Sequence, residues 1–192
     1  MSELRSLVLR NRSYRRFDET HRIGRDTLVE LVDLARHTAS AANRQPLRYI
    51  LSCGPETNAR IFPCLAWAGY LKDWPGPAPG ERPTAYIVIT VDTQVAKDWW
   101  CDDGIVAQTM LLGAVERGLG GCMIGAVQKD RLREVLSIPE HLFIRLVLAL
   151  GKPAETVVIE DLEPGGDIRY WRDDEGVHHV PKRRLEELIV AG

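Results

Sequence analysis

The sequence predicts a single α+β domain, and three observations support this class. Two largely apolar runs, 85–91 and 143–150, predict buried strands because they are rich in β-branched and aromatic residues. Residues 102–117 are apolar on nearly every side, which is typical of a helix buried at the centre of a domain. The chain has 192 residues, 45% of them hydrophobic and 27% charged, so it is long enough for one sizeable core.

Apolar side chains at helical spacing predict further helices around these strands. An early helix is expected to be capped by Asp26 or Thr27. The central helix is expected to begin with a cap from Asp102 or Asp103 and to end at Gly118, where glycine permits a left-handed backbone. The predicted helices cover residues 4–8, 26–39, 55–62, 102–117 and, with Asp130 as its cap, 130–138.

Shorter signals define the remaining strands and the C-terminal tail. Residues 47–52 follow Pro46 and have the composition of a strand. Near the C-terminus, residues 173–176 predict the turn of a β-hairpin. His178 and His179 are adjacent and would point to opposite sides of a strand, so we expect no metal site there.

Composition and charge exclude several classes of function. The formal net charge of -2 and the pI near 6.2 give no general attraction to nucleic acid or to an anionic membrane. No apolar run reaches the roughly 18 to 20 residues that a membrane helix needs. The four cysteines lack CxxC spacing and zinc-ligand partners, and the first residues contain no apolar signal core. We therefore expect a cytoplasmic protein without metal, membrane or nucleic-acid partners.

A compact basic segment near the N-terminus is the strongest local signal for an anion. Arg10, Arg12, Arg15 and Arg16 lie within seven residues, together with Ser13. Guanidinium groups donate paired hydrogen bonds that match the oxygens of a phosphate ester. The alternative is a solvated basic loop whose arginines pair with scattered carboxylates. A nucleic-acid site is the weaker interpretation, because one cluster in an acidic protein supplies few phosphate contacts.

A loop of small and amide residues suggests the surroundings of a planar ligand. Residues 39–46 carry Ser40, Asn43 and Gln45 on a backbone that small alanines leave uncluttered, so their polar groups can recognise a heterocycle. The alternative is a polar turn whose amides are satisfied by its own backbone.

Two more segments have both a functional and a purely structural interpretation. Gly120 and Gly121 follow the central helix, and a backbone without side chains there can lie flat against a ligand, or form an ordinary glycine-rich turn. The segment 67–83 is rich in aromatic residues and proline, and it predicts a lid or binding wall at a substrate mouth, or a rigid surface linker.

The order of these motifs resembles the nitroreductase family of FMN-dependent oxidoreductases over nearly the whole chain. RSYRRF at 12–17 is similar to the family's phosphate-binding motif, and ASAANRQP at 39–46 is similar to its Pro-Ser-x-x-Asn-x-Gln-Pro loop. Residues 102–126 resemble its central dimer helix and the glycine segment that faces the flavin, and LALGKPAE and VPKRRL resemble its later segments. The sequence departs from the family pattern at Asn11, at Ala39 in place of proline, and at Leu47 in place of an aromatic residue.

The resemblance implies a nitroreductase-like fold, with a central, mostly antiparallel sheet flanked by helices. It also implies one domain over residues 1–192, a C-terminal arm from about residue 155, and an interlocked homodimer that binds FMN at its interface. Part of the implied site holds the phosphate, ribityl chain and nearby ring edge, and another part comes from the second subunit. The implied cofactor-binding residues are Arg12, Ser13, Arg15, Arg16, Ser40, Asn43, Gln45, Gly121, Cys122, Lys182 and Arg184.

The same resemblance implies a reaction in two halves. NAD(P)H would deliver a hydride to flavin N5, and an electron-poor small molecule such as a nitroaromatic or a quinone would then be reduced on the same face. No catalytic side chain is implied, because solvent can supply the proton. The alternatives are a protein of the same fold with other chemistry, such as reductive dehalogenation or flavin cleavage, and a module that stores or senses FMN.

Overall fold

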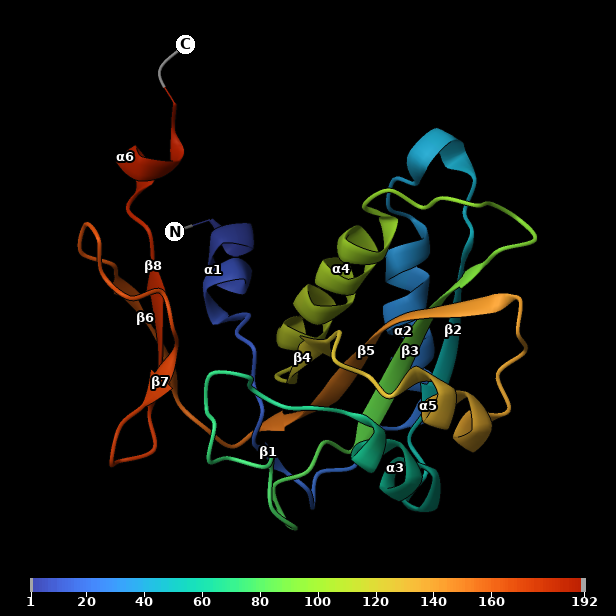
Figure 1. Cartoon of the computed structure of the whole chain (residues 1–192), viewed down its shortest axis with the longest axis horizontal. Coiled ribbons are helices and arrows are strands. Elements are labelled where there is room, and N and C mark those ends of the chain that lie inside the picture. Colours follow the sequence, from blue (N-terminus) through green and yellow to red (C-terminus); the bar gives the residue numbers. More distant parts are fainter. Residues whose placement is uncertain (1, 191–192) are drawn as a thin grey trace.

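An antiparallel sheet of five strands forms the centre of the protein in the computed structural model, which describes residues 2–190 (Figure 1). Four strands follow the order β1-β5-β3-β2, and β4 also pairs with β5. All of these pairs are antiparallel. The predicted central antiparallel sheet is therefore confirmed. Its strands are β1 (Phe17–Asp18), β2 (Leu47–Ser52), β3 (Ala85–Asp92), β4 (Gly120–Ile124) and β5 (Leu142–Pro153).

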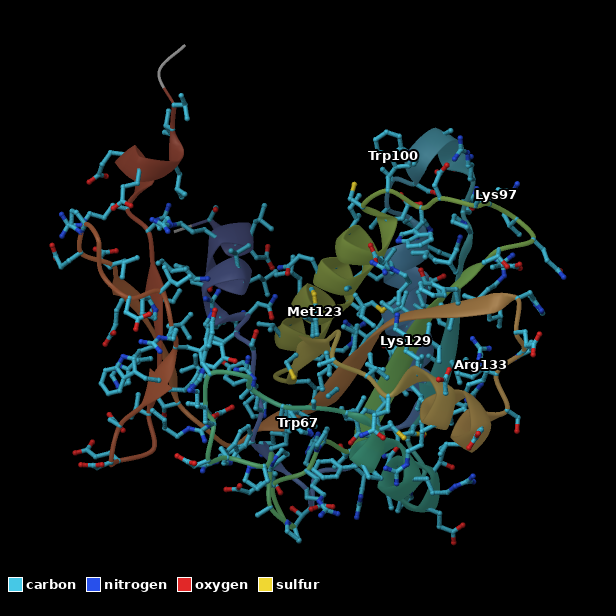
Figure 2. The ribbon with its side chains drawn as sticks, viewed as in Figure 1. Trp67, Lys97, Trp100, Met123, Lys129 and Arg133 are labelled. Atoms are coloured by element: carbon cyan, nitrogen blue, oxygen red, sulfur yellow. The ribbon has the colours of Figure 1, made fainter. Side chains whose placement is uncertain are left out.

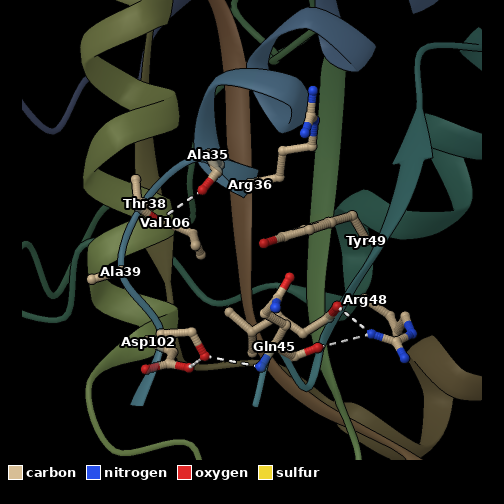
Figure 3. A pocket seen from close by; sticks show the side chains of 11 residues that line it. Ala35, Arg36, Thr38, Ala39, Gln45, Arg48, Tyr49, Asp102 and Val106 are labelled. Atoms are coloured by element: carbon tan, nitrogen blue, oxygen red, sulfur yellow. Dashed lines mark hydrogen bonds between the residues drawn. The ribbon is translucent and has the colours of Figure 1, made fainter. Parts of the chain in front are cut away.

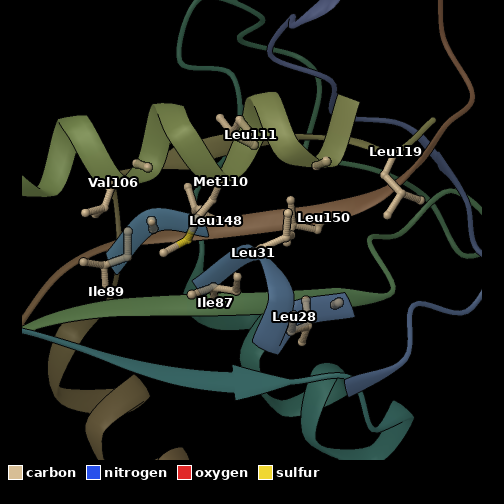
Figure 4. Packing of buried hydrophobic residues seen from close by; sticks show 14 of the residues in the cluster. Leu28, Leu31, Ile87, Ile89, Val106, Met110, Leu111, Leu119, Leu148 and Leu150 are labelled. Carbon is tan, nitrogen blue, oxygen red and sulfur yellow. The ribbon is translucent and has the colours of Figure 1, made fainter. Parts of the chain in front are cut away.

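Helices cover both faces of this sheet, because its middle strands are apolar on both sides. On β3, Ile87 and Ile89 pack into one buried cluster, and Tyr86 and Val88 pack into another on the opposite face. The first cluster joins the sheet to α2 (Arg25–Arg36) and α4 (Asp102–Glu116), as Figure 4 shows. The second joins it to α3 (Pro55–Ile61) and α5 (Lys129–Leu136).

The central helix α4 is confirmed, but its predicted N-terminal cap is wrong. Gly118 has a left-handed φ of +71° just after the helix, as expected. The N-cap position is Cys101, and Asp102 lies one residue further on, in the first turn. Asp102 accepts hydrogen bonds from another loop, and Asp103 pairs with Arg145. These tertiary partners take the oxygens that a cap would have used.

The caps of two other helices also differ from prediction. Helix α2 begins at Arg25 after Gly24, and it ends at Arg36 rather than near residue 39. Helix α5 has Gln128 at its N-cap position, so the expected cap, Asp130, lies inside the helix. In both helices an aspartate occupies the first turn, where its charge is favoured by the helix dipole without a capping bond.

A second sheet is built by the C-terminal part of the chain. Its order is β6-β8-β7, with β6 (Val157–Asp161) parallel to β8 (His178–Lys182) and β7 (Trp171–Arg172) antiparallel to it. The predicted hairpin around residues 173–176 is confirmed, whereas β6 was not predicted. This sheet lies apart from the central one, with α1 (Glu3–Arg10) between it and α4 (Figure 1). Three short helical segments complete the chain: η1 (Ala41–Asn43), η2 (Phe62–Cys64) and α6 (Leu185–Leu188).

Candidate functional site

A cavity of about 360 Å³ lies between the N-terminal segment, α4, β4 and the C-terminal sheet. It brings together residues that are far apart in the sequence, including four of those predicted to bind an anion. Two guanidinium groups, one ammonium and one hydroxyl form a donor set that suits a phosphate ester. The cavity is lined by the predicted residues Arg12, Ser13, Arg15 and Lys182, and also by Tyr170 and His178.

Glu155 fixes the backbone from which the arginines extend. Its carboxylate accepts hydrogen bonds from the backbone N–H groups of Arg15 and, at 3.0 Å, Arg16. The same carboxylate pairs with Arg172 at 2.8 Å, and the Glu155 side chain is only 2% exposed. The N-terminal basic segment is thereby tied to β7. Sequence reasoning missed this role, because backbone N–H partners leave no residue-specific signal.

The two arginines of the cavity are held in place but keep unused hydrogen-bonding capacity. Arg12 donates to the Val8 carbonyl at 2.7 Å, whereas its buried Nε has no partner among the described residues. Burial lowers the pKa of Arg12. Arg15 donates to the Ser13 carbonyl at 3.1 Å, and its guanidinium lies 4.9 Å from the centre of the Tyr170 ring. A buried cation without a partner is costly, so this arrangement fits an anion that completes the hydrogen bonds.

His178 is a buried member of this site that the sequence analysis considered only as a metal ligand. Its Nε2 lies 3.3 Å from Arg15 Nη1, and its buried Nδ1 has no partner among residues 2–190. Burial, followed by the charge of Arg15, lowers its pKa to about 4, so the neutral ring accepts a hydrogen bond from Arg15. His179 points the other way and stacks on Trp171 at 4.0 Å. Strand alternation was the available signal, because it places one of two adjacent histidines inside.

The buried neutral state of His178 predicts a loss of stability in mild acid. Its pKa is lowered from 6.5 to about 4, so the folded state binds this proton less readily than the unfolded chain does. The neutral ring contributes its full stability above pH 6.5. The free energy of unfolding should fall as the pH drops from 6.5 to about 4. Urea midpoints measured near both ends of the window, for the wild type and for His178→Gln, check this prediction. The variant cannot be protonated there, so an equal loss in both proteins would contradict it.

The glycine segment on β4 has a packing role. Ser13 forms a bridge with Gly121, and a Cβ at Gly121 would lie 2.4 Å from the Ala149 carbonyl oxygen. Cys122 is buried in the second cluster, on the other face of the sheet, and burial raises its pKa to about 12. Met123 lines the cavity and lies beside α4 (Figure 2). Gly121 and Cys122 can therefore face a cofactor only through their backbone.

Two of the predicted basic residues lie outside this cavity. Arg16 is 3.5 Å from the Glu81 carboxylate, and its guanidinium lies 6.0 Å from the centre of a Trp74 ring. Arg184 pairs with Glu163 at 2.5 Å on the C-terminal sheet. Arg16 and Arg184 therefore each pair with a carboxylate, and the sequence pattern did not predict these pairs.

The predicted amide loop is organised by one buried carboxylate. Asp102 accepts hydrogen bonds from the Ser40 hydroxyl at 2.6 Å and from the Ala41 backbone at 3.0 Å. Ser40 in turn accepts a hydrogen bond from the Gln45 backbone at 2.9 Å. The Gln45 side chain donates to Asn43 Oδ1 at 3.0 Å. The polar residues of the loop thus hydrogen-bond to one another. This agrees in part with the alternative interpretation, a polar turn whose amides are satisfied within the loop.

The same loop is held in an unusual backbone conformation. Left-handed φ values cost free energy in residues other than glycine, and they concentrate at functional sites. The loop has three such values, at Ala42 (φ 50°), Asn43 (φ 53°) and Gln45 (φ 50°).

The loop and the anion cavity lie apart within one chain. Ser40 and Gln45 line a second cavity of about 170 Å³, next to Asp102 at the start of α4 (Figure 3). The anion cavity instead includes Gln108 and Leu111, further along this helix. The structure therefore brings the predicted residues together in two groups rather than one.

The segment 67–83 contacts the wall of the anion cavity through its aromatic residues. The Tyr70 ring lies 4.9 Å from that of Tyr170, and the Tyr70 backbone donates to the Tyr170 hydroxyl at 3.4 Å. The role of this segment as a substrate mouth stays a prediction.

Two further classes of site were sought in the structure. Within residues 2–190, no cluster of three or more His, Cys, Asp or Glu side chains is arranged to hold a metal ion. No helix in the described part of the chain has the length and apolarity needed to cross a membrane.

Two relatives found by comparison with known proteins are named as reductases that use NADH or NADPH. A protein from Methanothermobacter thermautotrophicus, named as a candidate NADH dehydrogenase/NAD(P)H nitroreductase, is 28% identical over 158 residues, or 79% of this chain and 78% of the relative. The FMN reductase (NADPH) of Bacillus subtilis is 40% identical over 55 residues, which cover 28% of this chain and 22% of the relative.

A solved structure and a family model extend the comparison to the rest of the chain. A nitroreductase family protein from Streptococcus pneumoniae superposes with a TM-score of 0.70 at 16% identity, covering 99% of this chain and 100% of the other. This likeness shows the fold. The model of the nitroreductase family matches residues 8–152, which hold the central sheet and the N-terminal basic segment. The chain therefore belongs to the nitroreductase family.

Proposed function

We propose that the protein is an FMN-dependent oxidoreductase that uses NAD(P)H to reduce electron-poor small molecules such as nitroaromatics and quinones. The observation that carries the proposal is the cavity in which Arg12, Ser13, Arg15 and Lys182 converge. Its donors suit the phosphate of FMN, and Arg12 keeps a buried nitrogen without a partner among the described residues. The names of the relatives, an NAD(P)H nitroreductase and an FMN reductase, agree with this cofactor and donor.

We further propose that the working unit is a homodimer with two sites. Within one chain the phosphate residues and the loop of Ser40, Asn43 and Gln45 belong to two separate regions along α4. A second copy can bring its loop to the first copy's anion cavity, so that each flavin is held by both subunits. The proposal thus explains why the predicted residues form two groups.

The side chains of the site bind and orient rather than react. When bound, FMN supplies the redox chemistry by accepting a hydride from NAD(P)H at N5 and passing it to the acceptor. Arg12, Arg15 and Lys182 neutralise the phosphate, and Ser13 adds a hydroxyl donor. The amides of the partner's loop would contact the polar edge of the ring. The resemblance assigned both Lys182 and Arg184 to the phosphate. Because Arg184 pairs with Glu163, we propose that Lys182 fills this role without it.

The cysteines agree with a reducing compartment. Cys53, Cys64, Cys101 and Cys122 are all free thiols. A protein that keeps several free thiols, one of them exposed, suits the cytoplasm, where disulfides are rare. We place the protein there.

An absorption spectrum of the purified protein, followed by anaerobic addition of NADH and then NADPH, tests the proposed function. We expect flavin bands that bleach with at least one nucleotide and recover when a nitroaromatic or quinone is added. Flavin bands that persist with both nucleotides would contradict the reductase and favour storage or sensing of FMN. A protein that takes up no FMN would contradict the site itself.

A further inference from the structure

The cavity beneath the amide loop is large enough to hold an aromatic ring. Its volume is about 170 Å³, and it lies between the end of α2, the loop, the start of β2 and the start of α4 (Figure 3). An apolar protein cavity of roughly 150 Å³ is known to bind benzene. The cavity is partly open to solvent, and its volume leaves room for an aromatic ring.

The inner walls of the cavity are apolar. Ala35, Leu47 and Val106 line it, and they are 1%, 9% and 6% exposed. Because the Leu47 side chain lines the cavity, a larger side chain at this position would take up the free space.

Tyr49 supplies the polar group that faces this space. It lies on the same face of β2 as Leu47, and Figure 3 shows its hydroxyl directed into the cavity. The hydroxyl makes no hydrogen bond to another described residue. Burial, followed by the charge of Asp102, raises the pKa of Tyr49 to about 12, so the hydroxyl stays protonated and can donate.

The charged groups around the cavity already have partners. Arg36 pairs with Asp33 at 2.5 Å, and Arg48 lies 3.3 Å from the Asp92 carboxylate. Arg48 also donates to the carbonyls of residues 45 and 47, which fixes the rim of the cavity. Asp102 is occupied by the loop. These pairings leave no net cation to attract an anion, so the arrangement favours a neutral ligand.

We propose that this cavity binds one neutral aromatic ring of the electron acceptor, with a nitro or carbonyl oxygen accepting a hydrogen bond from Tyr49. The inference rests on the proposed function, because Ser40 and Gln45 border the cavity and belong to the loop expected to meet the partner's flavin. It adds two residues, Leu47 and Tyr49, that select the acceptor.

Equilibrium dialysis of nitrobenzene against the purified protein, without NAD(P)H, tests the inference by binding alone. We expect the wild type to bind nitrobenzene saturably. Tyr49→Phe should weaken nitrobenzene binding about threefold to tenfold, the range for one neutral hydrogen bond. Leu47→Trp should abolish it by filling the cavity. Tyr86→Phe removes a buried hydroxyl in the second cluster, on the opposite face of the sheet, and serves as the matched control, with no change expected.

The outcomes separate this inference from the proposed function. Unchanged nitrobenzene affinity in both Tyr49→Phe and Leu47→Trp would overturn the inference, and Tyr49→Phe keeps this test valid if Leu47→Trp fails to fold. A wild type that binds no nitrobenzene would also overturn it. Flavin content and bleaching by NAD(P)H are measured on the same preparations. A protein whose flavin NAD(P)H does not reduce, yet whose nitrobenzene binding follows the expected pattern, would uphold the cavity and overturn the proposed function.

Discussion

Replacing both Arg12 and Arg15 with alanine is expected to yield protein that purifies almost free of flavin. Both guanidinium groups line the 360 Å³ cavity, where they would share the phosphate with Ser13 and Lys182. A hydrogen bond to a charged group contributes about 1.5–3 kcal/mol, so the loss of two amounts to about 3–6 kcal/mol. The dissociation constant for FMN should therefore rise by roughly two to four orders of magnitude. Fluorescence titration of the flavin-free protein with FMN measures this change.

Arg16→Ala is the matched control for this double variant. Arg16 is part of the same basic segment but lies next to Glu81 and Trp74, outside the cavity. Its removal should leave FMN affinity within about threefold of the wild type. The flavin-free double variant should be folded, because Arg12 carries a buried nitrogen without a described partner and its removal relieves desolvation. A folded double variant that retains full FMN affinity would contradict the phosphate assignment.

The fold was predictable wherever local pattern and burial agree. The apolar runs 85–91 and 143–150 became β3 and β5, and the all-round apolar segment became α4. Strand β6 was missed because its partner, β8, lies about twenty residues away and pairs in parallel, which no short turn signals. Helix caps were predicted less well, because aspartates near helix ends also serve long-range partners.

The site was predictable in part, and its limits have a physical cause. Motif order singled out Arg12, Ser13, Arg15 and Lys182, which the structure brings together in one cavity, while their contact with a cofactor stays a prediction. It did not separate them from Arg184, because a sequence does not show which basic side chain will meet a nearby carboxylate. The roles of Glu155 and His178 at the anion cavity were missed for a related reason. Glu155 acts on the backbone of Arg15 and Arg16, and His178 contacts the Arg15 side chain. Both contacts join residues that are distant in the sequence.

Asp102→Ala is expected to remove the support of the amide loop and to lower flavin affinity from a position outside the anion cavity. The Asp102 carboxylate holds the Ser40 hydroxyl and the Ala41 backbone, and Asp102 is only 2% exposed. Without it these donors lose their partner while the left-handed residues of the loop keep their strain. The free energy of unfolding should fall by about 2–4 kcal/mol, the usual cost of breaking a buried network. Urea unfolding of the flavin-free protein measures this loss.

A comparison with Asp103→Ala separates loop support from general stability. Asp103 is the next residue of the same helical turn, is 7% exposed and pairs with Arg145 at 2.8 Å, away from the loop. Both variants should lose stability, because each leaves a partly buried donor without its acceptor. Only Asp102→Ala should also weaken FMN, and Ser40→Ala should reproduce part of that effect, since Ser40 links the carboxylate to Gln45. If both aspartate variants weaken FMN equally for the same loss of stability, the loop's conformation does not control the cofactor.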